Sequence, residues 1–187
     1  MTKILAIAGS PRKDGNSAAL LRQVVAGAED AGASVETYFL HELNIRPCDA
    51  CDACKSLNEC VIDDDMQKLY PKLREADVLV IASPIYYFTV STQTKLFMDR
   101  WYSLGEEFDS ALHGKQVAIV LTYGGDDVFS SGAVNAIRTF QDTFRYLGVH
   151  IAGMVYGKAS DAGEIKADKQ LMDKAYELGR KLAAGKS

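Results

Sequence analysis

The sequence has no apolar run near the roughly 20 residues that a membrane-spanning helix needs. Its longest clean runs, such as residues 78–82, have only the length of a strand. The apolar stretch 4–8 is too short for a signal peptide. We therefore expect a cytoplasmic protein with no membrane partner. With 21 Lys and Arg against 25 Asp and Glu, the net charge is −4. A mildly acidic chain is a poor general ligand for nucleic acid, so we expect no such partner.

Several well-known nucleotide and catalytic motifs are also missing. No Gly-Lys-Ser/Thr follows the first glycine-containing loop, which excludes a Walker A phosphate loop, and the dinucleotide fingerprint Gly-x-Gly-x-x-Gly is absent. A phospho-acceptor signalling domain needs acidic residues where the first and third strands end, but those ends read Gly9-Ser10 and Ser83-Pro84. The three histidines are scattered and no catalytic triad is evident, so we assign no side chain as a catalytic acid, base or nucleophile.

Strand-length apolar runs alternate with segments of helical periodicity along all 187 residues. The predicted strands are 4–8, 35–40, 78–82, 117–121 and 149–155. Such alternation predicts parallel strands joined by right-handed helical crossovers. An eight-unit barrel would need about 250 residues. We therefore predict a single α/β domain, 1–187, with a flavodoxin-like doubly wound five-stranded parallel sheet in the order 2-1-3-4-5. The run 35–40 is only partly apolar, which suits an edge strand.

Three predicted loops follow the first, third and fourth strands, at residues 9–17, 83–88 and 122–127. Carboxyl ends of parallel strands meet at one sheet edge, where ligands of open α/β sheets bind. The first loop has small residues and hydroxyls before a helix N-terminus, which is typical of an anion site. The second contains a proline and three aromatic residues, and the third contains a tyrosine and two glycines. A phosphate cradle beside walls for a planar ring indicates flavin mononucleotide (FMN).

Short matching stretches give the chain a resemblance to the NADPH-dependent FMN reductase family. The stretches are Gly9-Ser10-Pro11-Arg12, Gly15-Asn16-Ser17, Ser83-Pro84-Ile85-Tyr86, Lys95-Leu96-Phe97-Met98-Asp99-Arg100 and Gly124-Gly125. The spacing Cys48-x2-Cys51-x2-Cys54-x5-Cys60 resembles the compact motif of the iron–sulfur flavoproteins within that family. The resemblance implies bound FMN, electron transfer and assembly as a homodimer or homotetramer, with FMN near subunit interfaces.

The resemblance also implies a role for individual residues. Ser10, Arg12, Asn16 and Ser17 would hold the FMN phosphate; Pro84, Ile85, Tyr86 and Tyr87 would flank the isoalloxazine; and Thr122, Tyr123 and Gly124 would lie on its other side. On a predicted helix over residues 92–102, Lys95, Asp99 and Arg100 would lie below the flavin, toward a partner subunit. The aromatic residues Phe97, Trp101 and Tyr102 of this helix favour an interface, because such residues are enriched there.

All four cysteines lie in a long segment without periodicity, residues 41–62, inserted after the second strand. The spacing of Cys48, Cys51, Cys54 and Cys60 suits the ligands of a [4Fe–4S] cluster. A structural zinc site and empty or disulfide-forming thiols are the other two interpretations, because spacing indicates ligands but not the metal. We expect this segment at the same sheet edge as the three loops, or at that edge of a neighbouring subunit.

These features predict an FMN-dependent oxidoreductase that passes electrons from NAD(P)H, its co-substrate, to a flavin, quinone or similar acceptor. The acceptor would be a small molecule or a redox protein, and a [4Fe–4S] cluster would take part if one is bound. Two alternatives remain at this point. One is an electron carrier between one-electron partners, and the other is an FMN-binding protein without turnover.

Overall fold

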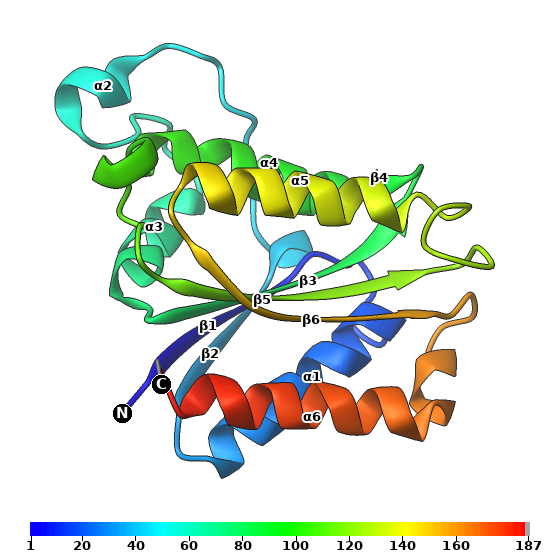
Figure 1. Ribbon diagram of the computed structural model, residues 1–187. Coiled ribbons are helices and arrows are strands. Elements are labelled where there is room, and N and C mark those ends of the chain that lie inside the picture. Colours follow the sequence, from blue (N-terminus) through cyan, green and yellow to red (C-terminus); the bar gives the residue numbers. More distant parts are fainter. Residues whose placement is uncertain (186–187) are drawn as a thin grey trace.

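The computed structural model describes residues 1–185, and its centre is a twisted parallel sheet (Figure 1). Five strands run in the order β2-β1-β3-β5-β6. Their bounds are β1 Lys3–Ala8, β2 Ser34–Phe39, β3 Val78–Tyr86, β5 Gln116–Tyr123 and β6 His150–Lys158. The order equals the predicted 2-1-3-4-5 once the short strand β4 is left out of the numbering. The partly apolar strand β2 lies at an edge, as its composition predicted.

The prediction of five purely parallel strands is wrong in one respect. Strand β3 continues to Tyr86 and turns back into β4, Thr89–Val90, which pairs with it antiparallel. The pairs Ile85 with Val90 and Tyr86 with Thr89 leave a two-residue turn between the strands. The aromatic run that the sequence placed in a loop is therefore the tip of a small hairpin.

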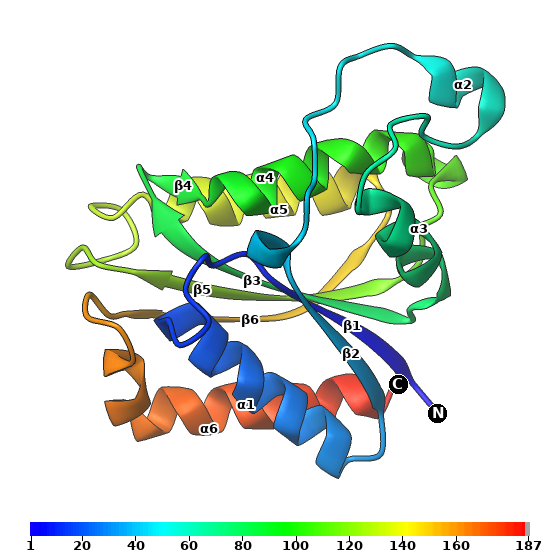
Figure 2. The same ribbon diagram turned by 180° about the vertical axis from the view of Figure 1, so that it is seen from behind.

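Helices cover both faces of the sheet, and the views in Figures 1 and 2 agree on the two layers. One layer contains α1 (Asn16–Asp30) and α6 (Lys169–Ala183); the other contains α3 (Met66–Glu75), α4 (Thr92–Asp99) and α5 (Ala133–Tyr146). Alternate residues of the central strands enter opposite cores. In β3, Val80 packs with the α1 and α6 side, whereas Leu79 and Ile81 pack with the other side. This two-sided burial explains the uninterrupted apolar runs.

The remaining elements are short. They are the helix α2 (Ala53–Leu57) and the 3-10 helices η1 (Leu40–Glu42), η2 (Arg100–Leu104), η3 (Glu107–Asp109) and η4 (Glu164–Ala167). Helix α2 lies in the cysteine segment and was not predicted, and the predicted helix 92–102 divides into α4 and η2. Among the described residues, no helix combines the length and apolar character that crossing a bilayer would require.

The expectation that Phe97 and Trp101 face a partner subunit is wrong. Both side chains are buried in the core of this chain, at 0% and 3% exposure. The Trp101 ring packs edge-on against Phe97 with 5.2 Å between centroids and lies 5.9 Å from the ring of Phe144. Because η2 follows α4 over the sheet, Trp101 fills the space beside α5 instead of pointing outward. Only Tyr102 of the three is exposed.

Candidate functional site

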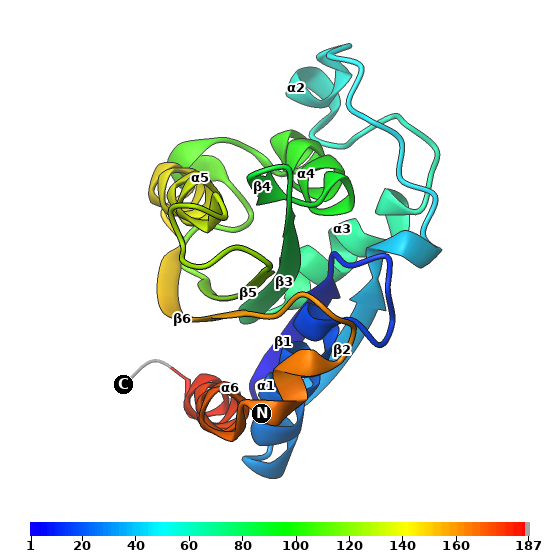
Figure 3. The same ribbon diagram turned by 90° about the vertical axis from the view of Figure 1, so that its right-hand side faces the viewer.

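The loops after β1, β3 and β5 meet at the carboxyl edge of the sheet. This edge faces the viewer in Figure 3. Buried hydroxyls bind the first two loops together. The Ser91 hydroxyl donates to the Gly9 carbonyl at 2.7 Å, and the Ser91 backbone N–H donates to Ser83 Oγ at 3.0 Å. Gly9 is needed here because a Cβ would lie 1.9 Å from Thr94 Oγ1. The first loop is therefore fixed against the start of α4.

The first loop keeps polar groups available for an anion. Ser10 is buried and its Oγ accepts the Arg12 backbone N–H at 3.0 Å, while Arg12 itself is exposed. Helix α1 begins after Gly15 with no side-chain cap on its first N–H groups. The Ser17 hydroxyl is buried without a hydrogen-bond partner among the described residues. Free N–H groups and an unpartnered hydroxyl at a helix N-terminus suit a phosphate.

Asn16 has a structural role that the sequence did not indicate. Its Nδ2 donates to the Asp161 carbonyl at 2.9 Å, and its Oδ1 accepts the Ile165 backbone N–H at 3.2 Å. One N–H of the Asn16 side-chain amide and its oxygen are therefore already engaged in hydrogen bonds to the segment before α6. These partners lie about 150 positions away along the chain, so no local pattern could reveal them.

The β3–β4 turn has an unusual backbone for its residues. Tyr87 and Phe88 have φ values of 45° and 67°, the left-handed region that two-residue hairpin turns require and that Asn and Gly usually fill. Their side chains are 98% and 60% exposed, so burial does not explain their presence. The turn is held by the Asn135 Nδ2 donating to the Phe88 carbonyl at 3.1 Å. Strained aromatic residues at a loop edge are a signature of a functional surface.

The other predicted ring-contacting residues sit around this turn. Pro84 and Thr122 are buried, Ile85 and Tyr123 are half-buried, and Tyr86 and Gly124 are exposed. Burial raises the pKa of Tyr123, with a smaller contribution from neighbouring Tyr156. The structure therefore places all the predicted ring-contacting residues at one edge, on β3, its turn and the end of β5.

The loop after β5 adds an aromatic residue that the sequence analysis did not select. The Asp127 carboxylate accepts the backbone N–H groups of Phe129 and Ser130 at 2.7 and 2.8 Å, which folds the loop back on itself. Phe129 is 75% exposed on that loop. Asp127 is a typical turn residue, because its carboxylate can accept the N–H two residues later. A turn residue does not, however, predict that the Phe129 ring is exposed.

The four cysteines line one cavity, together with Arg100 and Tyr102 of η2. Left-handed backbone at Ala50, Asp52 and Asn58 makes the turns that gather them. Burial raises the pKa of Cys54, and the other three thiols add to that rise, as expected for sulfurs sharing a small space. Within residues 1–185, however, no three His, Cys, Asp or Glu side chains converge closely enough to form a metal site as they stand.

The cysteine segment does not share the sheet edge with the three loops. Helix α4 starts beside Ser91, next to the first loop, and its other end continues into η2, against which α2 packs (Figures 1 and 2). Eight helical residues separate the two ends by about 12 Å. The expectation of a common edge within one chain is thus wrong, because the chain runs from η1 across the helix layer. The same edge of a neighbouring subunit stays a prediction.

A buried ion pair lies beneath the cysteine segment. Arg100 pairs with Asp64, and both side chains are almost completely buried, at 1% and 0% exposure. Burial acts to raise the pKa of Asp64, but the hydrogen bond from Arg100 and two from backbone N–H groups hold it below its usual value. The expectation that Arg100 faces a partner subunit is therefore wrong. A buried Arg needs partners, and these lie 36 and more positions away.

Cys60 has a different environment from the other three thiols. The Arg100 Nη2 donates to Cys60 Sγ at 3.3 Å. Burial alone would raise the pKa of Cys60, but hydrogen bonds from a backbone N–H, Tyr70 and Arg100 lower it. The same surroundings, chiefly burial, raise the pKa of Tyr70 to about 12. The chain thus favours the thiolate form at Cys60 and disfavours it at Cys54.

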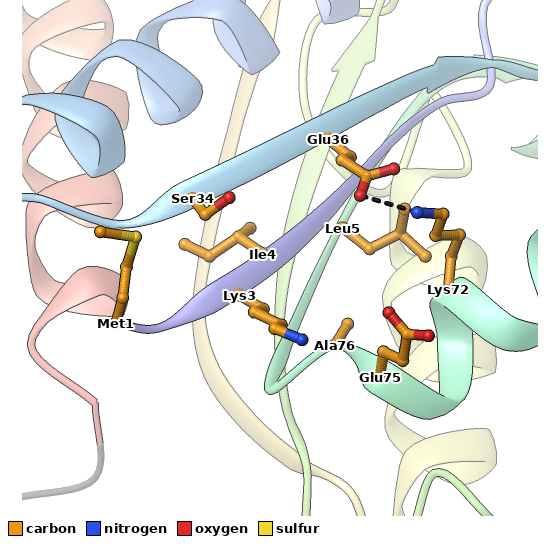
Figure 4. A pocket seen from close by; sticks show the side chains of 9 residues that line it. All are labelled: Met1, Lys3, Ile4, Leu5, Ser34, Glu36, Lys72, Glu75 and Ala76. Carbon is orange, nitrogen blue, oxygen red and sulfur yellow. Dashed lines mark hydrogen bonds and ion pairs between the residues drawn. The ribbon is translucent and has the colours of Figure 1, made fainter.

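A separate pocket of about 210 Å³ lies at the opposite end of the sheet, where β1 and β2 begin (Figure 4). Side chains from β1, β2 and α3 line it, and Lys72 bridges to Glu36 at 2.9 Å. That hydrogen bond is the main reason that the pKa of Glu36 is lowered. None of the predicted site residues lines this pocket, so it is not part of the candidate site.

Comparison with solved structures defines the class of protein. An NAD(P)H:quinone oxidoreductase from Methanothermobacter marburgensis superposes with a TM-score of 0.74 at 16% identity, covering 97% of this chain and 98% of that one. An archaeal flavodoxin superposes with a TM-score of 0.60 at 16% identity, covering 98% and 97%. At these identities the likeness shows the fold, which is flavodoxin-like.

The sequence comparisons then identify the family. Residues 2–180 match the NADPH-dependent FMN reductase family, and the chain belongs to it. An iron–sulfur flavoprotein from Methanosarcina thermophila is 35% identical over 153 residues, which are 82% of this chain and 75% of that one. A putative NAD(P)H-dependent FMN-containing oxidoreductase from Bacillus subtilis is 28% identical over 94% and 96%. The predicted resemblance is confirmed, and the chain is an NAD(P)H-dependent oxidoreductase of this family.

Proposed function

We propose that this chain binds FMN at the carboxyl edge of its sheet and passes electrons from NAD(P)H to a flavin, quinone or similar acceptor. The observation that carries the proposal is the buried Ser17 hydroxyl at the uncapped start of α1, which has no hydrogen-bond partner within residues 1–185. A buried hydroxyl without a partner costs free energy unless something outside the chain satisfies it. A phosphate in the first loop would do so, and family membership supports FMN as its bearer.

Different residues would bind the phosphate and the ring of FMN. Ser10, Ser17 and the N–H groups of the first turn of α1 would bind the phosphate, and exposed Arg12 would add positive charge. Tyr86, Tyr87, Tyr123 and the backbone at Gly124 would flank the ring, with Phe88 and Phe129 at its margin. Bound FMN would supply the redox chemistry, exchanging electrons in pairs with a nicotinamide and in pairs or singly with an acceptor. The side chains bind and orient, and none need act as a catalytic acid or base.

We also propose that the cysteine segment holds a [4Fe–4S] cluster. Support comes from the donor set, since four thiols line one cavity and all four would be needed as ligands. Gathered thiolates repel one another, and a cationic cluster core would neutralise them. The name of the 35% identical relative adds support. The segment would close around the cluster to bring the sulfurs to ligand distance.

Replacing Cys51 with serine should remove the cluster and leave FMN in place. Cys51 lies in the cysteine segment, across α4 from the three loops, so no FMN contact is expected to change. Iron and acid-labile sulfide should fall from the wild-type level to near zero after anaerobic preparation, while FMN per chain stays constant. Ser56→Ala is the matched control in the same segment. Zinc in the wild-type protein, or no metal with freely titrating thiols, would contradict the cluster.

We further propose that the chain assembles as a homodimer or homotetramer through the edge that carries Tyr87, Phe88 and Phe129. Three exposed aromatic side chains gather at that edge, and aromatic residues are enriched at interfaces. Two of them occupy the strained β3–β4 turn although both are exposed there. This argues that they contact a molecule other than their own chain. This surface replaces Trp101 as the predicted anchor.

The double variant Tyr87→Asn/Phe88→Gly should be more stable but assemble less well. Asn and Gly suit left-handed turn positions, so the free energy of unfolding per chain should rise by about 1–2 kcal/mol through relief of strain. Urea unfolding of dilute protein measures it. Light scattering at micromolar concentration should show the wild type as an oligomer and the variant shifted toward monomer. A monomeric wild type, or a variant that is less stable and still fully assembled, would contradict the account.

A further inference from the structure

The cysteine segment is closed at its neck, between residues 44 and 65. The Asn44 backbone N–H donates to the Asp65 carboxylate at 2.7 Å, and the Asp65 N–H returns to the Asn44 carbonyl at 3.1 Å. One step inward, the Arg46 N–H donates to Asp64 Oδ2 at 2.8 Å. Arg100 donates to the Arg46 carbonyl at 2.8 Å and pairs with Asp64, so it binds both strands of the neck. The segment and the residues that flank it therefore form a long loop closed by a buried clasp.

Arg100, the central residue of this clasp, also contacts one of the four sulfurs, that of Cys60. While Nη1 of Arg100 holds the neck, Nη2 donates to Cys60 Sγ at 3.3 Å. The Arg100 Nε–H is buried and has no hydrogen-bond partner among the described residues. Arg100 also lines the cavity that the four cysteines share. A buried guanidinium that lines the thiol cavity, with one N–H on a thiol, is placed to interact with whatever the thiols bind.

We propose that Arg100 is a positioning residue for the cysteine centre: it fixes Cys60 as a ligand and raises the reduction potential of the cluster. This inference rests on the proposed cluster. One-electron reduction adds one negative charge to the cluster and its thiolates. A positive charge and N–H groups beside a ligand sulfur stabilise that added charge, which moves the potential upward. Asp49 and Asp52 line the same cavity and act in the opposite direction. Asp64 offsets part of the Arg100 charge, so the N–H contact with Cys60 carries the effect.

Arginine is the residue type that the geometry demands. Its planar fork directs several N–H donors at once, here to a carboxylate, a carbonyl and a sulfur. A lysine keeps the charge but has a single ammonium group, which cannot span all three acceptors in the same geometry. Arg100→Lys therefore separates the contact with Cys60 from the mere presence of a buried cation.

The test is the midpoint potential of the reconstituted cluster, measured by anaerobic redox titration with the reduced cluster followed by electron paramagnetic resonance. Wild type, Arg100→Lys and Lys55→Met are compared. Lys55 is the matched control because it is in the same segment and pairs with Asp52, but it is exposed and its interactions are screened by solvent. We expect a more negative potential in Arg100→Lys and an unchanged potential in Lys55→Met. Loss of iron in Arg100→Lys alone, with native circular dichroism, would also support the positioning role.

The outcomes against the inference are distinct from those against the cluster. An Arg100→Lys protein with full iron content and the wild-type potential would overturn the inference and leave the cluster proposal standing. An equal shift in Lys55→Met would also overturn it, because the effect would then be one of general charge. A wild-type chain that assembles no cluster on anaerobic reconstitution would overturn the proposed centre and this inference together. If Arg100→Lys does not fold, Arg100→Met/Asp64→Asn takes its place. It removes both charges and every N–H donor to Cys60, so the lost contact gives the same expected direction.

Discussion

Replacing Arg100 with methionine is expected to lower the free energy of unfolding by about 3–5 kcal/mol, the usual cost of removing one partner of a buried ion pair. The Asp64 side chain is completely buried, so the carboxylate would be left without its cation. The neck of the cysteine segment would lose the Arg46 contact as well. Urea unfolding of the metal-free protein measures the change without any contribution from a bound cluster.

Removing the second charge provides the control. Arg100→Met/Asp64→Asn should recover a large part of the lost stability, because it no longer leaves an uncompensated buried charge. Arg138→Met on α5 removes an exposed cation that pairs with Asp142 and should cost less than about 1 kcal/mol. If Arg100→Met cost no more than Arg138→Met, the Arg100–Asp64 pair would behave as a solvated pair, and the clasp described here would be wrong.

Replacing Ser17 with alanine is expected to weaken FMN binding by roughly 10–150-fold while leaving the fold as stable as before. The affinity loss follows from a hydrogen bond to a charged phosphate, worth about 1.5–3 kcal/mol. Stability should be unchanged or slightly higher because the Ser17 hydroxyl has no partner within the described chain, so its removal deletes an unsatisfied group. Equilibrium titration of the apoprotein with FMN gives the affinity, and urea unfolding without FMN gives the stability.

Asn16 is the contrasting neighbour. Its side chain makes two hydrogen bonds to the Asp161–Ile165 region, so Asn16→Ala should lower the free energy of unfolding by about 1–3 kcal/mol even without FMN. The two variants therefore separate binding from folding at adjacent positions. Ser17→Ala binding FMN as tightly as the wild type would show that the phosphate is held elsewhere.

The arrangement of the sheet could be predicted because it depends on patterns that are local in sequence. Each central strand is apolar on both faces, so a continuous run identifies it, and the partly polar β2 is recognisable as an edge strand. The loops at the carboxyl edge follow from strand order alone. The hairpin tip at Tyr87 and Phe88 did not follow, because neither residue favours a left-handed turn.

Side-chain burial was the property predicted least accurately from the sequence. Trp101 and Arg100 are neighbours on η2, and both were expected to face a partner subunit, yet both are buried. Their partners, Phe144 and Asp64, come from distant segments and become neighbours only when α5 and the cysteine segment pack against η2. In the same way, the cysteine spacing predicted shared ligands but not the side of the molecule where they gather.

The most direct test of the central claim is the anaerobic addition of NADPH or NADH to FMN-saturated protein, followed by its visible spectrum. We predict that purified protein retains FMN near one per chain, that the oxidised flavin absorbance is lost on adding at least one of the two nucleotides, and that it returns on adding a quinone. Ser17→Ala should need more added FMN for the same response. A wild-type protein that binds no FMN, or whose bound FMN stays oxidised with both nucleotides, would contradict the account.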